Sequence, residues 1–153
     1  MAGLVGSNDI VKFIKENFFG KVVEIGVGSH YDVAIKLSRC FKVIVTDIID
    51  VDQIDEKIRG IYVKDDISNP RLSIYTGASL IYSIRPPIEI QIDILNLAYK
   101  VGSNSLIRPL GSEVVNDIRL TLKNFGRAAF YMTREDKTSE VKLFRADHKT
   151  SSN

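Results

Sequence analysis

Two kinds of hydrophobic pattern alternate along the chain. Short apolar runs rich in valine and isoleucine are typical of strands buried inside a parallel sheet, and they lie at residues 21–25, 42–46, 60–63, 78–83 and 105–107. Between several of these runs the apolar residues are spaced three or four apart, as on one face of a helix, for instance at residues 31–39 and 88–100. The alternation predicts a series of strand–helix units.

The helix expected after the fourth run has the clearest boundaries. Pro86 and Pro87 suit a helix start, where a missing N–H group does no harm, and Gly102 suits the helix end. The polar residues of this helix form one narrow stripe, consisting of Glu89, Asp93, Asn96 and Lys100. We therefore expect the helix to be largely buried against the sheet.

The C-terminal part of the pattern differs from the rest. Strand-like runs at residues 118–124 and 128–133 are separated by a short segment that contains Gly126, which is typical of a β-hairpin. Together the elements predict an α/β protein, a Rossmann-like three-layer sandwich whose mostly parallel sheet ends in an antiparallel C-terminal edge hairpin. A chain of 153 residues leaves little room for a second core, so we expect a single domain over residues 1–136 and a polar, flexible tail over residues 137–153.

Composition mainly excludes possibilities. The formal net charge of +2 is too small to indicate nucleic acid or an anionic membrane as a partner, and the chain shows neither a long apolar run nor a signal-peptide pattern. We therefore expect a cytoplasmic protein that does not associate with membranes. A single cysteine, Cys40, excludes an intrachain disulfide, and with two histidines it provides no zinc-type ligand set, so we expect no metal. The position of Cys40 near the end of a helical pattern, beside Phe41, predicts a buried and inert thiol.

Polar residues or glycines follow each of the parallel strand runs. The first run passes into Gly26 and Gly28, which permit a tight bend and a close approach of a ligand to the backbone. A helix follows, and its N-terminus favours a nucleotide-like or otherwise polar ligand. Because ligands bind such sheets at the carboxyl ends of the strands, the candidate site residues are Glu24, Gly26, Gly28, Asp47, Asp66, Ser83, Arg85 and Arg108.

Several of these residues have an alternative, structural role. Glu24 either faces an ammonium group of the ligand or pairs with an arginine. The alternative for Asp47 is a cap on the polar helix that follows it, and the alternative for Asp66 is a turn. Arg85 and Arg108 each follow a strand and precede a proline, so neighbouring strands would bring both guanidinium groups to one rim that suits a phosphate or carboxylate. Their alternative role is to neutralise Glu24, Asp66 or Glu113.

The motif Glu24-Ile-Gly26-Val-Gly28, followed by Asp47, Asp66 and a terminal hairpin, resembles the core of class I S-adenosylmethionine-dependent methyltransferases over residues 21–133. The resemblance implies that the glycine turn passes beside the methionine part of the cofactor. It also implies that Asp47 binds the ribose hydroxyls and that Asp66 lies near the adenine. The segment Ser83-Ile-Arg85-Pro86-Pro87 stands where many members carry a polar-Pro-Pro catalytic motif. More closely, residues 80–87 and 106–110 resemble a small uncharacterised archaeal family of Rossmann-fold, methyltransferase-like proteins.

Three functions remain open. The first is an S-adenosylmethionine-binding methyltransferase of unknown acceptor, in which Ser83, Arg85 and Arg108 orient an anionic small molecule or a nucleic acid. The second is a non-catalytic subunit that binds a nucleoside cofactor or joins a larger assembly, in keeping with the small size of the chain. The third, an NAD-binding oxidoreductase, is less favoured, because no Tyr-x-x-x-Lys pair occurs and the glycine motif lacks a third glycine.

Overall fold

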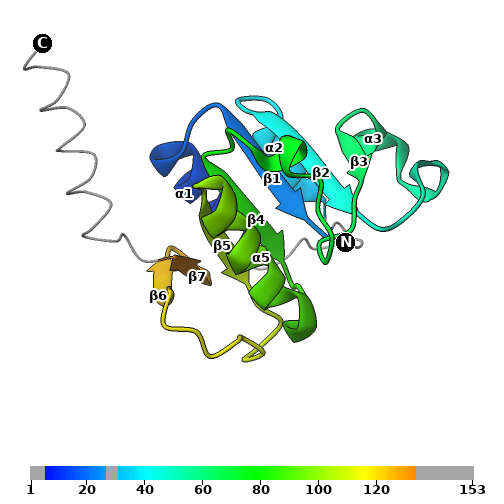
Figure 1. Cartoon of the computed structure of the whole chain (residues 1–153). Helices are drawn as coiled ribbons and strands as arrows, with labels where there is room; N and C mark the ends of the chain where they lie inside the picture. Colours follow the sequence, from blue (N-terminus) through cyan, green and yellow to red (C-terminus); the bar gives the residue numbers. More distant parts are fainter. Residues whose placement is uncertain (1–5, 27–30, 134–153) are drawn as a thin grey trace, which may run out of the picture.

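A computed structural model of the chain describes residues 6–26 and 31–133 (Figure 1). The predicted C-terminal tail at residues 137–153 and the predicted ligand-binding residue Gly28 lie outside the described residues. Within the described part, one sheet runs through the molecule and helices pack on both of its faces.

The sheet contains seven strands in the order β3-β2-β1-β4-β5-β7-β6. The first five strands along the chain pair in parallel, whereas β7 is antiparallel to both β5 and β6. This confirms the predicted α/β fold with its mostly parallel sheet and antiparallel C-terminal hairpin. The strands are β1 (Lys21–Ile25), β2 (Lys42–Asp47), β3 (Tyr62–Lys64), β4 (Leu80–Ile84), β5 (Asn104–Arg108), β6 (Leu120–Phe125) and β7 (Ala128–Thr133).

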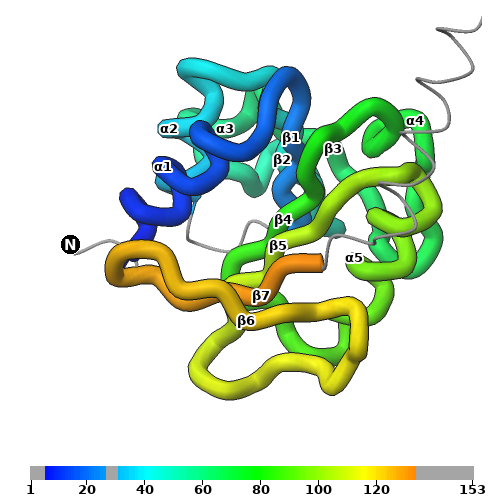
Figure 2. Tube along the Cα trace, turned by 90° about the vertical axis from the view of Figure 1, so that its left-hand side faces the viewer, coloured from blue at the N-terminus to red at the C-terminus, as the bar shows by residue number. Residues whose placement is uncertain are grey.

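The helices divide between the two faces, as Figure 2 shows. Alternate side chains of each strand point to opposite faces, so Val22 packs with the residues of α1 and α2, and Val23 packs with those of α4 and α5. This arrangement gives the three layers expected from the pattern. The helices are α1 (Ser7–Asn17), α2 (Asp32–Leu37), α3 (Glu56–Arg59), α4 (Leu72–Tyr75) and α5 (Ile88–Val101), with a short 3₁₀-helix, η1 (Val51–Gln53).

Helix α5 is less buried than its sequence predicts. It begins directly after Pro87 and ends at Gly102, as expected, and it buries Ile94 and Leu97. Ile92 and Tyr99, however, are 37% and 81% exposed. The reason is that α5 lies in an outer layer and contacts the sheet along one face only, so apolar residues beyond that face stay in contact with solvent.

The expectation of a buried thiol at Cys40 is wrong, because Cys40 is exposed. Helix α2 ends at Leu37, earlier than the pattern suggests, and Cys40 lies in the turn that leads into β2. Its backbone N–H donates to the Leu37 carbonyl at 2.9 Å. The side chain therefore falls outside the buried face of the helix.

Two further observations concern membranes and metals. No helix in the described ranges is long and apolar enough to cross a bilayer. The same ranges contain no group of three or more histidine, cysteine, aspartate or glutamate side chains placed to hold a metal ion.

Candidate functional site

The turn after β1 is built around Gly26. Its backbone has a φ of 75°, in the left-handed region that glycine adopts without strain. Its N–H donates to the Thr46 carbonyl at 2.7 Å, which extends the pairing of β1 with β2, and the Ser83 hydroxyl donates to the Ile25 carbonyl at 2.6 Å. Among the described residues, the atom nearest to a Cβ built on Gly26 would be the Ser83 Oγ, at 3.9 Å. The hydrogen bonds of Gly26 and Ser83 thus fix the start of the turn to β2 and β4.

Glu24 lies just before this turn and is completely buried. It is the register partner of Tyr82 on the neighbouring strand β4, and the Tyr82 side chain is completely buried as well. Within the described part of the chain, neither carboxyl oxygen of Glu24 has a hydrogen-bond partner, and the same holds for the Tyr82 hydroxyl. Burial raises the pKa of the Glu24 carboxyl to about 8, the nearby Tyr82 hydroxyl opposes this increase, and the negative charge of Asp32 adds to it. Near neutral pH, Glu24 is therefore mostly a neutral carboxylic acid.

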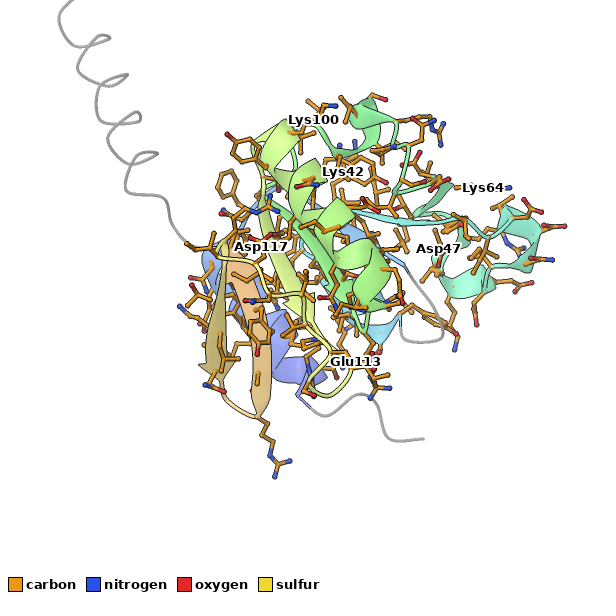
Figure 3. All side chains as sticks on the ribbon, turned by 60° about the horizontal axis from the view of Figure 1, so that its bottom comes forward. Lys42, Asp47, Lys64, Lys100, Glu113 and Asp117 are labelled. Carbon is orange, nitrogen blue, oxygen red and sulfur yellow. The ribbon has the colours of Figure 1, made fainter. Side chains whose placement is uncertain are left out.

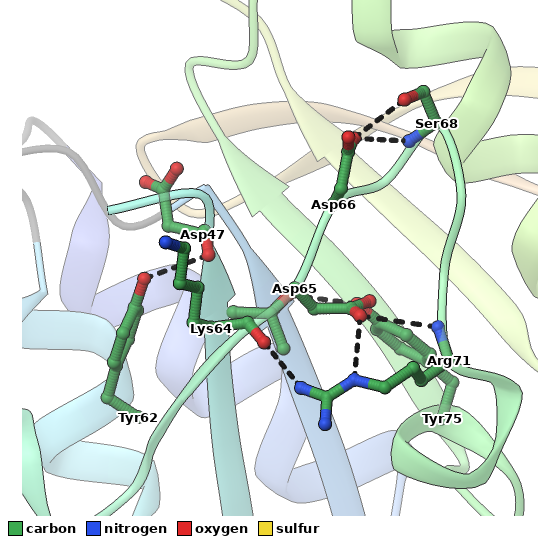
Figure 4. Close-up of polar contacts among 9 residues, drawn as sticks. Asp47, Tyr62, Lys64, Asp65, Asp66, Ser68, Arg71 and Tyr75 are labelled. Carbon is green, nitrogen blue, oxygen red and sulfur yellow. Dashed lines mark hydrogen bonds and ion pairs between the residues drawn. The ribbon is translucent and has the colours of Figure 1, made fainter. Parts of the chain in front are cut away.

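Asp47 ends β2 and is half-buried beside the turn. Its carboxylate accepts a hydrogen bond from the Ile48 N–H at 2.7 Å, and its carbonyl accepts one from the Tyr62 hydroxyl at 2.8 Å (Figure 4). The N-cap of η1 is Asp50, and the N-cap of α3 is Asp55, whose carboxylate accepts from the Lys57 N–H. The alternative role of Asp47 as a helix cap is therefore wrong.

Asp65 and Asp66 follow β3 and have different environments (Figure 4). The Asp65 side chain is buried and accepts hydrogen bonds from the Tyr75 hydroxyl at 2.6 Å and from the Arg71 Nε at 3.3 Å. Asp66 is exposed, and its Oδ1 accepts from the N–H and the hydroxyl of Ser68, which lower the pKa of the Asp66 carboxyl. Asp66 thus forms the predicted turn, and its second carboxyl oxygen accepts no hydrogen bond from a described residue. Asp65 holds the end of β3 in place.

Ser83 is completely buried near the end of β4, and its hydroxyl is bonded to the Ile25 carbonyl. It lies on the face of the sheet that α4 and α5 cover. Arg108 ends β5 as the register partner of Ile84, so its side chain starts on the opposite face. The structure therefore places Ser83 close to the Gly26 turn and separates its side chain from that of Arg108.

The predicted arginine rim is formed by neighbouring strands. The Arg85 N–H donates to the Arg108 carbonyl at 2.6 Å, which joins the two residues at the ends of β4 and β5. Arg85 is exposed and has a φ of 55°, a left-handed conformation that is uncommon for a residue with a side chain. The Arg108 guanidinium donates from Nη1 to the Pro109 carbonyl at 3.1 Å, whereas its buried Nε has no hydrogen-bond partner in residues 6–26 and 31–133. Arg108 forms no ion pair with a described residue, so its predicted alternative of neutralising Glu24, Asp66 or Glu113 is not observed.

Sequence reasoning missed two residues that shape this region. Gln91 is buried on α5; its side-chain amide donates to the Glu113 carbonyl at 2.7 Å, and its side-chain oxygen accepts from the Val115 N–H at 2.8 Å. It thereby ties the loop after β5 to the helix after β4. Tyr75 is the other missed residue, because its hydroxyl bonds the Asp65 carboxylate. The signal for Gln91 is a single amide side chain on an otherwise apolar helix face, whereas a lone tyrosine in an apolar segment gives no comparable signal.

Solved structures with a similar fold include S-adenosylmethionine (SAM)-dependent methyltransferases. A TehB-like SAM-dependent methyltransferase from Corynebacterium glutamicum matches with a TM-score of 0.55 at 16% identity, covering 84% of this chain and 88% of that one. A SAM-dependent methyltransferase from Clostridium acetobutylicum matches with a TM-score of 0.51 at 18% identity, covering 85% of this chain and 61% of that one. At such low identity, the likeness establishes the fold alone.

Sequence comparison identifies closer relatives. A UPF0146 protein of Methanocaldococcus jannaschii is 44% identical over 124 residues, which make up 80% of this chain and 90% of the relative. Another, of Archaeoglobus fulgidus, is 41% identical over 128 residues, which make up 83% of this chain and 94% of the relative. The family model that matches residues 7–135 is described as Uncharacterised protein family (UPF0146). Since the match includes every strand of the sheet, the chain belongs to this family, with archaeal relatives and a Rossmann-like fold shared with class I SAM-dependent methyltransferases.

Proposed function

We propose that the protein binds SAM at the carboxyl ends of β1, β2 and β3, and that it is a methyltransferase whose acceptor lies beside β4 and β5. The shared fold supports the choice of cofactor. The order of the strands supports the location, because the candidate residues follow neighbouring strands at one edge of the sheet.

The carboxyl group of Glu24 is the observation that carries the proposal. It is completely buried, has no hydrogen-bond partner among the described residues and lies two residues before the turn at Gly26. A buried polar group without a partner costs free energy, so a ligand that supplies a hydrogen-bond donor is stabilised there. The ammonium group in the methionine part of SAM is such a donor, and its positive charge would favour the ionised form of Glu24.

Asp47 and Asp66 extend the site away from Glu24 along the sheet. Adjacent strands lie about 4.8 Å apart, so the step from β1 to β3 spans roughly 10 Å, the scale of a nucleoside. We assign the ribose hydroxyls to Asp47 and the adenine to Asp66. The second carboxyl oxygen of Asp66 forms no hydrogen bond with a described residue and could accept one from the exocyclic amino group.

Ser83, Arg85 and Arg108 position the cofactor and the methyl acceptor. When bound, SAM supplies an electrophilic methyl group. Ser83 holds the Ile25 carbonyl and so fixes the turn at Gly26, and Arg85 and Arg108 orient the acceptor from the ends of β4 and β5. Alignment of two reactants in one site can supply a large part of a rate enhancement, so the proposal needs no further acid or base from the chain.

Calorimetric titration with SAM, S-adenosylhomocysteine and NAD, run in parallel, tests the proposal. We expect saturable binding of the two adenosyl ligands and none of NAD. Binding of NAD alone would indicate an oxidoreductase. The absence of binding by all three would contradict the proposal and favour a non-catalytic subunit that uses the Rossmann-like fold as a scaffold.

A further inference from the structure

We propose that Arg85 and Arg108 form a binding site for an oxyanion, a phosphate or carboxylate group carried by a small molecule. The further assignment of this oxyanion to the methyl acceptor rests on the proposed function. The existence of the site does not, because it follows from the geometry of the two arginines at the ends of β4 and β5.

The two residues are held together by the backbone. Ile84 and Arg108 are register partners, and the Arg85 N–H donates to the Arg108 carbonyl at 2.6 Å. Adjacent strands lie about 4.8 Å apart, so two long cationic side chains start from neighbouring points on the same edge of the sheet.

Arg108 has hydrogen-bonding capacity that the protein does not use. A guanidinium group presents five N–H donors in a planar fork. The described residues provide an acceptor for Nη1, the Pro109 carbonyl, and provide none for the buried Nε. An oxyanion has two acceptor oxygens at the spacing of the fork, so it can accept from Nε and from a second nitrogen at the same time.

The carboxylates closest in sequence to Arg85 and Arg108 do not neutralise the Arg108 guanidinium. Glu89 lies in the first turn of α5. Glu113, which is labelled in Figure 3, lies in the loop between β5 and β6. Both are exposed, and neither forms an ion pair with Arg108. The Glu113 contact with α5 comes from its carbonyl, which accepts a hydrogen bond from Gln91. An anion from solution would therefore meet the Arg108 guanidinium, which no carboxylate of the described residues neutralises.

The backbone of Arg85 adds an independent argument. Its φ of 55° is the only positive value at a residue other than glycine in the described part of the chain. Backbone strain of this kind persists where the surrounding structure holds it, and it is frequent at ligand sites. Here Ile84 and Pro86 are buried on either side, whereas Arg85 itself is exposed. The fold keeps a strained residue with a long cationic side chain in contact with solvent, beside Arg108.

The experiment titrates ¹⁵N-labelled protein with inorganic phosphate and, separately, with acetate, at constant ionic strength adjusted with chloride. The readout is the Nε–Hε signal of Arg108, assigned from its loss in Arg108→Lys. We expect a saturable shift of this signal, and the probe that binds more tightly identifies the anion as phosphate or carboxylate. Lysine keeps the charge but loses the fork, so Arg108→Lys should weaken binding about 10-fold, as measured by calorimetry.

Arg127→Lys is the matched control, because Arg127 is exposed in the β6–β7 turn and its backbone contact with Asp9 does not depend on the side chain. The Arg127→Lys variant should bind phosphate and acetate with the same affinity as the wild type. The proposal is overturned if neither anion shifts the Arg108 signal, if the control weakens binding equally, or if a single-stranded oligonucleotide binds while both small anions do not. SAM is titrated separately, so failure of the cofactor site and failure of the anion site are distinguished.

Discussion

Glu24 on β1 and Tyr82 on β4 are register partners, and the buried polar group of each lacks a hydrogen-bond partner among the residues that the structure describes. Burial raises both pKa values, that of Glu24 to about 8 and that of Tyr82 well above its usual range; Glu24 adds to the increase for Tyr82, whereas the Tyr82 hydroxyl opposes the increase for Glu24. The fold therefore tolerates Glu24 as a neutral acid. A charge appears at this position only when the pH rises or when a cationic ligand stabilises it.

The first prediction concerns Glu24→Gln. In the unfolded chain the Glu24 carboxyl has a pKa near 4.5, and in the native state this value is about 8, so the native state binds the extra proton between these values. The free energy of unfolding of the wild type therefore falls as the pH rises from about 4.5 to about 8, because the folded protein must hold a proton that the unfolded chain has already released. Glutamine does not ionise. The variant should gain in free energy of unfolding relative to the wild type by roughly 2 kcal/mol or more between about pH 5 and pH 9.

Chemical denaturation across that pH range measures this difference. Glu89→Gln serves as the control, because Glu89 is exposed on α5. The difference in free energy of unfolding between Glu89→Gln and the wild type should not rise with pH as that of Glu24→Gln does. A constant difference between Glu24→Gln and the wild type at all pH values would show that Glu24 is ionised in the folded protein.

The second prediction concerns the assignment of the ribose to Asp47. Asp47→Ala should weaken binding of S-adenosylhomocysteine about 10-fold or more, because a hydrogen bond to a charged group contributes about 1.5–3 kcal/mol. The fold should remain intact, since the carbonyl that accepts from Tyr62 is part of the backbone. Asp50→Ala is the control: Asp50 follows the same strand, but it is exposed and paired with Lys64. Equal calorimetric affinities for the wild type and Asp47→Ala would place the ribose elsewhere.

The third prediction tests the support of β3. The Tyr75 hydroxyl is buried and donates to the Asp65 carboxylate at 2.6 Å. Tyr75→Phe leaves this buried carboxylate without one of its donors, so the free energy of unfolding should fall by about 1–3 kcal/mol in chemical denaturation. Tyr99→Phe removes a hydroxyl from a residue that is 81% exposed and should have no measurable effect. Similar stabilities for the two variants would mean that the Tyr75–Asp65 contact adds nothing to the fold.

The fourth prediction uses Cys40. Because this thiol is exposed in the turn before β2, it should react with a thiol reagent in the native protein as completely as in denaturant. Mass spectrometry after labelling measures the extent of reaction. Protection of Cys40 under native conditions would support the buried position that the sequence pattern suggested.

The strands and their hairpin could be predicted from sequence because each depends on a local pattern. The isoleucine and valine runs indicated buried parallel strands, and the short segment at Gly126 indicated that β6 and β7 pair. Element boundaries were less certain; α2, for example, ends at Leu37, which moves Cys40 into the solvent. Helix α5 shows a related difference: its narrow polar stripe predicted a largely buried helix, whereas only the face toward the sheet is covered.

At the candidate site, too, some features follow from the local sequence pattern and others from the packing of distant segments. The sequence by itself determined that acidic, glycine and arginine residues follow the ends of the strands, because these positions are fixed once the strands are recognised. Only the tertiary structure decided how each side chain is used. Asp65 became a buried support and Asp66 an exposed turn residue, although they are adjacent in the chain. Such differences depend on which groups from distant segments lie within hydrogen-bonding distance and on how far each is removed from water, and both are properties of the packed molecule.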